Sequence, residues 1–334
     1  MIISLKETAE KLKSAENILI TAHLNPDGDA IGSSLALMQI LRGMKKNVAV
    51  YIDDKVPKNF LNLPCVEEIK RPAENEKISA DLLVILDTAT DRIGKVSDMT
   101  DAPILNIDHH VTNKGDGVDL YVEAEAAATC EIIFKLAQEL DAKITEDIAL
   151  CLYTGLATDT GFFNYSNTKP ATFHAAAELV ERGVHPNLVA EQIEKRTFRE
   201  VKVMSAALQT AKLYFNEKVA GMFVDLELFK KTDTTEGLID LIRVIDSVDV
   251  AFLLICHEEK LCRVSMRSKI ADVSEIAGKL GGGGHIHAAG CTLEKSFEES
   301  KKILIQSIGE YLLENKEISR TDFESGKEIS ISDL

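Results

Sequence analysis

The chain has 334 residues, of which 45% are hydrophobic and 28% are charged, as in an ordinary globular protein with room for two domains. Its formal net charge of -16 argues against a protein that grips long nucleic acid, because such proteins neutralise phosphates with basic surface. No apolar run reaches the roughly 18 residues of a membrane-spanning helix. The polar N-terminus lacks the pattern of a secretion signal. Short substrates, handled with the help of metal ions, fit this charge better than long duplexes.

The first half of the chain reads as alternating strands and helices. Continuous apolar runs predict strands at 17–22, 47–52, 81–89 and 102–110. Apolar periodicity predicts helices at 30–46, 127–140, 145–158, 169–182 and 186–195. Continuous rather than alternating apolar strands are typical of a parallel sheet that is buried on both faces. We therefore expect an α/β domain over residues 1–190, with a doubly wound, mainly parallel sheet.

The second half has a different pattern. A charged amphipathic helix predicts a helical linker at 191–211. Strands near 212–216, 219–226, 250–258 and 261–268, with a last helix near 297–314, predict a smaller α+β domain over 212–315. The remaining residues, 316–334, are polar and weakly patterned, and we expect a frayed tail.

The cysteines bear on the redox compartment. They lie far apart and form no C-x-x-C pair, so we expect neither a zinc site nor a disulfide framework. A reduced, cytoplasmic environment is the default expectation for such a chain. The six positions are Cys65, Cys130, Cys151, Cys256, Cys262 and Cys291.

Acidic and imidazole side chains follow several of the predicted strands. His23 follows the first strand, Asp87 ends the third, and "NIDHH" (106–110) ends the fourth. Ligands of open α/β sheets bind outside the carboxyl ends of the strands, so these groups are expected to converge. Carboxylates crowded there would repel one another unless cations lay among them. The predicted metal ligands are His23, Asp27, Asp29, Asp87, His109 and Asp159.

Each of these residues also has an ordinary structural interpretation. Asp27 and Asp29 lie in "NPDGD", which is rich in turn formers, and Asp87 could cap a turn. Asp159 could belong to a loop that stops a helix, and the two adjacent histidines could be surface residues. The argument for metal is therefore the expected convergence of the whole set, and no single position carries it.

The mixture of donors indicates which metal to expect. Carboxylates with a minority of imidazoles and no thiolate suit Mn²⁺ or Mg²⁺ better than a closed zinc site. One ion would use His23, Asp27 and Asp87, and a second would use Asp29, Asp87, His109 and Asp159, so that Asp87 bridges them. Two ions about 3.5–4 Å apart are a familiar device of phosphoryl chemistry. We expect Asp108 to orient a histidine and His110 to contact the phosphate or the leaving oxygen.

The glycine run "GGGGH" (281–285) allows two interpretations. It could be a flexible linker or a helix end, or it could let backbone N–H groups approach a phosphate or base. Because the run lies inside a compact unit, we favour the second, with Arg92 as a weaker phosphate contact in the first domain. The predicted substrate-binding residues are Arg92, Arg267, Gly282, Gly283, Gly284 and His285.

The motifs "HLNPDGDAIGS", "LDTA", "NIDHH" and "DTGFFNYSNT", in this order, resemble those of the DHH phosphoesterase superfamily. The segment "VSMRSK…DVSEIAGKLGGGGHIHAAG" looks like the DHH-associated domain of its exonuclease branch. The chain is most similar to the nanoRNase and pAp-phosphatase (NrnA-like) type. The resemblance implies a catalytic domain at 1–190 and a substrate-binding domain at 212–315. It places the metal ligands at the six positions named above, with His110 in the active site.

The resemblance also implies an activity and its cofactors. It implies hydrolysis of very short RNA or DNA oligonucleotides to 5′-mononucleotides, and of pAp to AMP, with two divalent ions, Mn²⁺ ahead of Mg²⁺ or Co²⁺. The expected partners are these substrates, with a homodimer as a candidate assembly and no membrane. Two alternatives stay open: a phosphodiesterase for linear or cyclic dinucleotides, and a metal-stabilised nucleotide-binding regulator without turnover. A family II pyrophosphatase is disfavoured, because its second domain lacks this glycine–histidine run.

Overall fold

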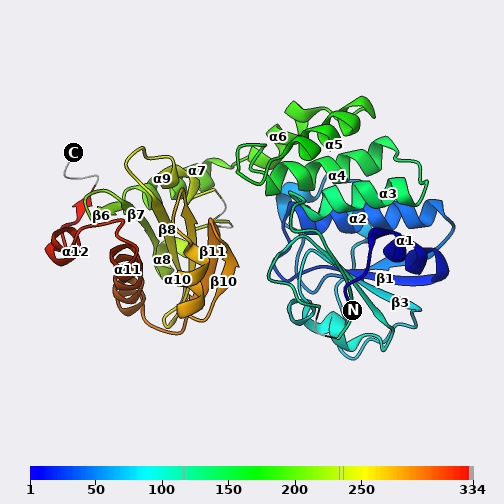
Figure 1. Cartoon of the computed structure of the whole chain (residues 1–334), viewed down its shortest axis with the longest axis horizontal. Coiled ribbons are helices and arrows are strands. Elements are labelled where there is room, and N and C mark those ends of the chain that lie inside the picture. The colour runs from blue at the N-terminus through cyan, green and yellow to red at the C-terminus, as the bar shows by residue number, and fades with distance from the viewer. Residues whose placement is uncertain (116, 233, 236, 331–334) are drawn as a thin grey trace. The chain divides into compact units, whose positions relative to one another are not determined.

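The computed structural model describes residues 1–115, 117–232, 234, 235 and 237–330 (Figure 1). The chain divides into two compact units, Met1–Lys195 and Arg196–Leu334. Each unit has its own sheet and its own hydrophobic core. The expected α/β class with two domains is therefore confirmed. The helix expected within the linker, α7, spans Phe198–Leu208 and belongs to the second unit.

The first unit contains a five-stranded sheet in which every neighbouring pair is parallel. The strand order is β2-β1-β3-β4-β5. The strands are β1 (Asn17–Thr21), β2 (Asn47–Val50), β3 (Leu82–Leu86), β4 (Ile104–Asp108) and β5 (Asp119–Val122). The predicted strands are present, and β5 is an additional edge strand that its short sequence "DLYV" did not reveal. All five residues of β3 are buried, as its continuous apolar run predicted.

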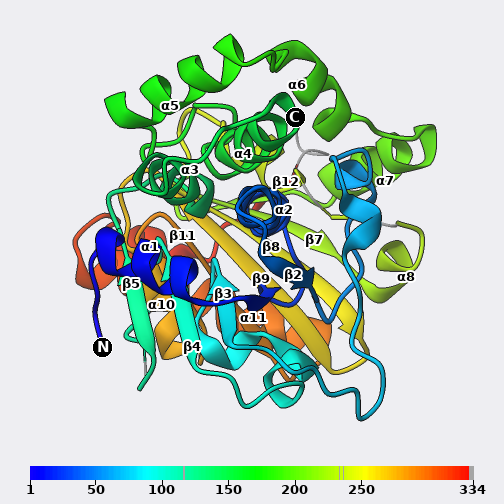
Figure 2. The same cartoon turned by 90° about the vertical axis from the view of Figure 1, so that its right-hand side faces the viewer.

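Helices of the first unit cover one face of this sheet (Figure 2). Ile93, Val96 and Met99, in and beside a 3₁₀ helix, pack on the other face. Helix α2 is buried along most of its length, which suits its position at the centre of the helical layer. The helices are α1 (Leu5–Ser14), α2 (Gly28–Gly43), α3 (Thr129–Glu139), α4 (Glu146–Asp159), α5 (Pro170–Glu181) and α6 (Pro186–Glu194). The 3₁₀ helices are η1 (Lys58–Phe60), η2 (Val66–Glu68), η3 (Thr90–Arg92) and η4 (Gly94–Asp98).

The strand order contains a switch point. From β1 the chain moves to β2 on one side and then returns to β3 on the other side of β1. At such a point the loops after the two central strands diverge and leave a crevice at the carboxyl edge of the sheet. Here those loops begin just after Thr21 and Leu86. The residues that follow β1 and β3 therefore lie where a ligand of such a sheet is expected to bind.

The second unit contains a mixed seven-stranded sheet in the order β10-β11-β9-β8-β7-β6-β12. Only the β7–β8 pair is parallel among the described pairs of this sheet. Its strands are β6 (Lys212–Tyr214), β7 (Val219–Val224), β8 (Val250–Glu258), β9 (Leu261–Ser268), β10 (Gly283–His285), β11 (Ala288–Leu293) and β12 (Ile329–Ser330). Besides α7 it has α8 (Leu226–Phe229), α9 (Asp240–Arg243), α10 (Val273–Lys279), α11 (Phe297–Glu314) and α12 (Arg320–Ser325). Among the described residues, no helix is both long and apolar enough to cross a bilayer.

The end of the chain is more structured than expected. Residues 316–334 were predicted as a frayed tail, yet α12 and β12 lie within them. Strand β12 pairs antiparallel with β6, and the Phe323 ring of α12 stacks on Phe215 with centroids 6.0 Å apart. Phe323 is partly buried against the core of the second unit, and it gives the segment a hydrophobic anchor that the polar composition hid. Residues 331–334 lie outside the described part.

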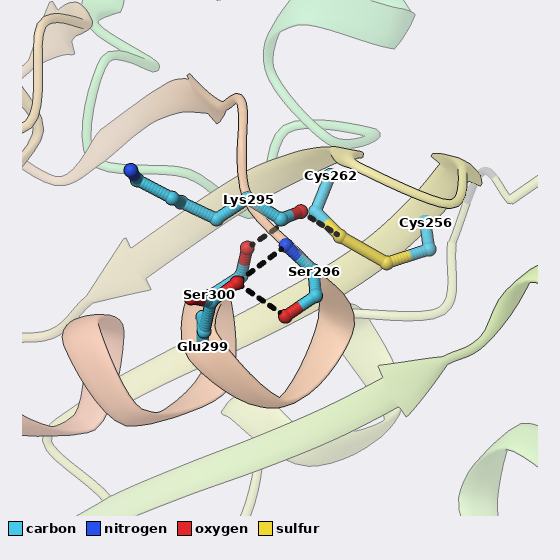
Figure 3. Close-up of a disulfide and its surroundings, with 6 residues drawn as sticks. All are labelled: Cys256, Cys262, Lys295, Ser296, Glu299 and Ser300. Carbon is cyan, nitrogen blue, oxygen red and sulfur yellow. Dashed lines mark hydrogen bonds between the residues drawn. A yellow bond between two sulfur atoms is a disulfide. The ribbon is translucent and has the colours of Figure 1, made fainter.

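A disulfide joins Cys256 and Cys262, so the expectation that the chain has none was wrong for this pair (Figure 3). The two residues face each other on the adjacent strands β8 and β9, close to the hairpin turn. Both are buried, and Cys262 Sγ lies 3.8 Å from the Lys295 carbonyl oxygen at the start of α11. Six residues of separation in a sequence do not reveal a cross-strand pair, because the register decides which side chains meet.

Candidate metal centre

The loop after β1 brings His23, Asp27 and Asp29 to the carboxyl edge of the sheet. Asp27 is the N-cap of α2, and its Oδ1 accepts from the N–H groups of Asp29 and Ala30 at 3.0 Å each. Asp27, which the sequence suggested as a turn residue, thus caps a helix. His23 Nδ1 lies 2.8 Å from the Leu24 carbonyl oxygen, which can only accept. In the neutral ring this leaves the lone pair on Nε2, which lies 3.8 Å from Asp27 Oδ1.

Asp87 lies at the middle of the cluster and has a left-handed backbone, with φ 61°. Its side chain is buried, with 2% of the residue exposed. Oδ2 lies 3.5 Å from His23 Nε2, and Oδ1 lies 3.4 Å from His109 Nε2. The two oxygens of the Asp87 carboxylate thus lie near two different imidazoles. This is the geometry of a group able to bridge two cations.

Asp29 and Asp159 complete the other side of the cluster. Asp29 has no exposed surface, and its two oxygens accept from the backbone N–H groups of Thr129 (2.6 Å) and Cys130 (2.8 Å). These N–H groups begin α3, so Asp29 caps a helix from a distant part of the chain. Asp159 ends α4, and its Oδ2 lies 3.2 Å from His109 Nε2.

These donors fit a metal ion. Ligand atoms of His23, Asp27 and Asp87 lie within 4.8 Å of one another, and so do those of Asp29, His109 and Asp159. Each set combines carboxylate oxygens with one imidazole nitrogen and contains no thiolate, which is the donor set of Mn²⁺ or Mg²⁺. Two adjacent sets with Asp87 near both form a candidate dinuclear centre.

The histidine–aspartate pair after β4 has a separate role in the geometry. Asp108 is fully buried, and its Oδ1 lies 2.7 Å from His110 Nδ1 and accepts from the backbone N–H of His109 at 2.7 Å. Its Oδ2 accepts from the Asn113 side-chain amide at 2.7 Å. Asp108 is thus fully engaged in holding the loop, and it fixes the ring of His110 through Nδ1. The predicted orienting contact is present.

The electrostatics of the cluster reflect a surplus of negative charge. Burial, followed by the charge of Asp87, raises the pKa of Asp29 to about 7, and burial and Asp29 raise the pKa of Asp159 well above its usual value. Burial would lower the pKa of His23, but the carboxylates of Asp27 and Asp87 outweigh it and raise the pKa to about 11. Without an ion, the site therefore holds protons where divalent cations would otherwise neutralise it.

Burial also opposes the charge on Asp87, but hydrogen bonds from His109 and His23 keep the pKa of its carboxyl well below the usual value. The pKa of His110 is raised, because the Asp108 carboxylate outweighs the effect of burial. The surroundings therefore favour opposite charges on the two groups, the anionic form of Asp87 and the protonated form of His110.

The loop after Asp159 is strained. Three consecutive residues have positive φ values: Gly161 (55°), Phe162 (55°) and Phe163 (65°). For a bulky residue such as Phe this conformation costs on the order of 1–3 kcal/mol and persists only where neighbouring structure enforces it. Asn164 contributes to that restraint, because its side-chain amide donates to the carbonyl oxygens of Gly161 and Phe162.

Arg92 lies at the end of η3, and its carbonyl oxygen accepts from Leu24 N–H at 2.9 Å. The backbone of Arg92 therefore helps to fix the loop that carries His23. Its side chain is exposed. The position suits the predicted contact with an anionic ligand.

In the second unit, the predicted substrate-binding residues lie on β9 and on or just before β10, with β11 between these two strands. His285 of β10 pairs with Ala288 of β11, which pairs with Arg267 of β9. Residues paired in this way point to the same face of a sheet, so His285 and Arg267 flank the small side chain of Ala288. The neighbouring row on this face, Gly283–Gly290–Ser265, is also small. On this face, the small residues Ala288, Gly283, Gly290 and Ser265 therefore lie beside and between the guanidinium of Arg267 and the imidazole of His285.

The glycines of this hairpin are required for different reasons. A Cβ on Gly282 would lie 2.1 Å from the Gly290 carbonyl oxygen, and one on Gly284, at φ 144°, would lie 2.5 Å from that of Ala288. These two positions are therefore explained by the close approach of β10 and β11. A Cβ on Gly283 would meet nothing within 4 Å, so within β10 this glycine leaves open space for a ligand.

Alanine substitutions should separate these two roles. We expect Gly282→Ala to lower the melting temperature by several degrees, because its Cβ overlaps a carbonyl oxygen, as forced overpacking costs about 1–3 kcal/mol. Gly283→Ala should leave the melting temperature unchanged within about 1 °C. Thermal unfolding by circular dichroism measures both. Equal losses in the two variants would contradict this division of roles.

Several neighbours of the cluster were not predicted. The Thr129 hydroxyl donates to Asp87 Oδ1 at 3.1 Å, and Asn106 donates to the Ile85 and Thr88 carbonyl oxygens from within β4. Asn113 lies between Asn106 and Asp108 and donates to both. A buried Asn inside an apolar strand was the available signal, since a polar residue there requires partners.

The first unit thus belongs to the class of α/β domains with a parallel sheet, and it carries a candidate metal centre of carboxylates and imidazoles at the switch point. The model of the DHH family, N-terminal domain, matches residues 17–156, and that of the DHHA1 domain matches 214–314. The chain belongs to the DHH family and carries the DHHA1 domain.

Relatives and solved structures agree with this membership. The chain is 35% identical to the bifunctional oligoribonuclease and PAP phosphatase NrnA of Thermus thermophilus, over 86% of this chain and 87% of that protein. It is 26% identical to the cyclic-di-AMP phosphodiesterase PdeA of Listeria monocytogenes, over 90% of this chain but 49% of that protein. An exopolyphosphatase-related protein from Bacteroides fragilis has a similar structure, with a TM-score of 0.83, 25% identity, and coverage of 92% of this chain and 96% of that one.

Proposed function

We propose that this protein is a divalent-metal-dependent phosphodiesterase that hydrolyses short oligonucleotides to 5′-mononucleotides and converts pAp to AMP. The observation that carries the proposal is the convergence of His23, Asp27, Asp29, Asp87, His109 and Asp159 at one sheet edge. The names of the relatives support the choice of substrates, since the relative with 35% identity is both an oligoribonuclease and a PAP phosphatase.

The proposed cofactor is a pair of divalent ions, Mn²⁺ ahead of Mg²⁺ or Co²⁺. His23, Asp27 and Asp87 would hold one ion, and Asp29, Asp87, His109 and Asp159 would hold the other. When bound, such a pair lowers the pKa of water to near neutrality and neutralises phosphate oxygens. Thr129 would orient Asp87 through its hydroxyl, as second-sphere partners commonly do.

His110 is proposed as the general acid. Its Nδ1 is paired with Asp108, so a proton on Nε2 is the one available for transfer to the departing oxygen. The Asp108 carboxylate raises the pKa of His110 and so favours the protonated ring that this role requires. Asp108 would hold the ring in one orientation and stabilise its charged form, with Asn113 fixing Asp108 in turn.

The second unit is proposed to hold the substrate. Arg267 can bind a phosphate with two parallel N–H donors, and His285 can donate to the same phosphate from the other side of Ala288. Gly283 allows a base or phosphate to approach the backbone closely. Arg92 would supply a further cation in the first unit. A few local cations in a chain of net charge -16 suit short substrates rather than long strands.

Metal affinity should rise with pH. In the metal-free protein His23, with a pKa of about 11, is protonated near neutrality, and Asp29, with a pKa of about 7, is protonated below it. A bound cation must displace these protons, so lower pH weakens binding. We expect the affinity for Mn²⁺ to increase about tenfold per pH unit for each displaced proton between about pH 6 and pH 8. Calorimetry in two buffers of different ionisation enthalpy measures the protons released; an affinity independent of pH would contradict the expectation.

A second candidate function is the hydrolysis of dinucleotides, linear or cyclic. The similarity to PdeA favours it, because that protein is named as a cyclic-di-AMP phosphodiesterase. A third candidate, a nucleotide-binding regulator without turnover, would have no use for two adjacent sets of metal ligands. Turnover and its products distinguish all three.

The deciding experiment is product analysis with Mn²⁺ on RNAs of two to about ten nucleotides labelled at either end, alongside pAp and cyclic di-AMP. We expect 5′-mononucleotides from the RNAs and AMP from pAp, with rates that fall as length increases. Rates that rise with length would refute the preference for short substrates. Hydrolysis of dinucleotides alone would favour the second candidate, and binding without turnover the regulator.

A further inference from the structure

An aromatic surface begins immediately after Asp159. The strained segment Gly161–Phe163 leads into α5, and its last residue stacks on that helix. The rings of Phe163 and Phe173 have centroids 5.5 Å apart and an interplanar angle of 23°. On its other side, Phe163 contacts the Tyr153 ring of α4 at 5.9 Å. The Phe173 ring is thus held in place by Phe163, which is held in turn by Tyr153, although 56% of Phe173 is exposed.

Phe173 forms part of a hollow in the surface of the first unit. The hollow has a volume of about 400 Å³ and is lined by Thr168, Lys169, Pro170, Phe173 and His174. One face of the Phe173 ring is covered by Phe163, so the exposed surface of the ring is available to a ligand in the hollow. Such exposure of a large apolar ring is not needed for the core, which the neighbouring rings already fill.

The hollow is tied to the metal cluster. The Asn167 side chain donates to the carbonyl oxygens of Asp159 at 3.0 Å and Ala127 at 3.1 Å. These bonds fix the loop residue that directly precedes Thr168, the first residue of the lining. Phe163 is four residues from Asp159, a distance of at most roughly 14 Å. The Phe173 ring stacks directly on Phe163. A strand of a few nucleotides can therefore reach from the cluster to the ring.

The chemistry of the hollow suits a nucleotide. An exposed aromatic ring stacks any base, and flanking cationic groups attract the phosphates of a single strand. Lys169 supplies an ammonium group at the edge, where it also pairs with Glu125, and His174 supplies an imidazole. An apolar protein partner is less well matched, because a lysine and a histidine line the hollow and Asn167, beside it in the chain, is hydrogen-bonded to the Asp159 backbone.

We propose that Phe173 is a base-stacking subsite for the part of an oligonucleotide that extends away from the scissile phosphate. The inference rests on the proposed function and adds to it a residue that determines length preference. A trinucleotide reaches the subsite and gains affinity from it. The single nucleoside of pAp does not, so pAp is hydrolysed without its help.

The test compares Phe173→Ala, Phe173→Tyr and Leu188→Ala with wild type on a trinucleotide and on pAp, with Mn²⁺. Leu188 is a matched control, because it is an equally exposed apolar residue (55%) of another helix, α6. Phe173→Ala should lower kcat/KM for the trinucleotide at least about fivefold, mainly through KM, and leave pAp within twofold. Phe173→Tyr should keep wild-type values, and Leu188→Ala should change neither substrate.

Unchanged trinucleotide kinetics in Phe173→Ala, or an equal loss on both substrates, would overturn the proposal. If wild type hydrolyses neither substrate, the proposed function fails, and the subsite is then tested by binding alone. Fluorescence anisotropy of a labelled oligoadenylate with EDTA measures that binding without turnover. Weaker binding by Phe173→Ala than by Leu188→Ala would support the subsite, and equal binding would refute it.

Discussion

Asp87→Asn is expected to lower kcat/KM for short oligonucleotides by more than about a hundredfold and to reduce the bound metal. Loss of an outer partner of a metal ligand already costs about 10–100-fold, and Asp87 is placed to be a shared ligand itself. Its oxygens lie 3.5 Å from His23 Nε2 and 3.4 Å from His109 Nε2. Asparagine has the same shape but no charge, so the change removes the anion and leaves the packing in place.

The measurement pairs steady-state hydrolysis of a dinucleotide with metal content after dialysis against Mn²⁺. Asp91→Asn is the matched control, because Asp91 is an exposed aspartate of η3 only four residues away. That variant should behave as wild type in both assays. Wild-type metal content and turnover in Asp87→Asn would remove the bridging carboxylate from the proposal.

His110→Gln is expected to reduce kcat by about 10²–10⁴-fold while leaving the metal content near that of wild type. The separation follows from the geometry, since His110 Nδ1 is paired with Asp108 at 2.7 Å. The ring is thus oriented by Asp108 rather than by the cations, and it contributes a proton. Glutamine keeps a hydrogen-bonding group of similar length but cannot donate a proton to a leaving group.

A substrate with a better leaving group provides the sharpest readout. If His110 protonates the departing oxygen, a nitrophenyl ester of a mononucleotide should be cleaved by His110→Gln at nearly the wild-type rate, because that oxygen needs no proton. His185→Gln, at an exposed histidine before α6, serves as the control and should retain full activity on both substrates. Equal losses on the two esters would argue that His110 has some other role.

The sequence was most informative about the sheet and its edge. Buried parallel strands are continuous apolar runs, so the ends of β1, β3 and β4 could be located, and with them His23, Asp87 and Asp108. The parallel arrangement then required those ends to share an edge. Convergence of the candidate ligands could be predicted because it depends on topology rather than on details of packing.

Features that depend on register or on backbone hydrogen bonds were less visible. The cross-strand disulfide, the pairing of Arg267 with Ala288, and the distinct role of Gly283 all follow from which residues face each other. No local pattern encodes that choice. The Thr129 contact with Asp87 joins residues 42 positions apart, and a threonine at a helix start has many ordinary explanations.

Asp29 illustrates how tightly one position can be constrained. Its carboxylate receives the first N–H groups of α3 and also faces His109 and Asp159. A neutral replacement would weaken the start of α3 and remove one of the proposed metal ligands in the same step. Folding stability and metal binding are therefore coupled at this residue, and a substitution here is expected to lower both.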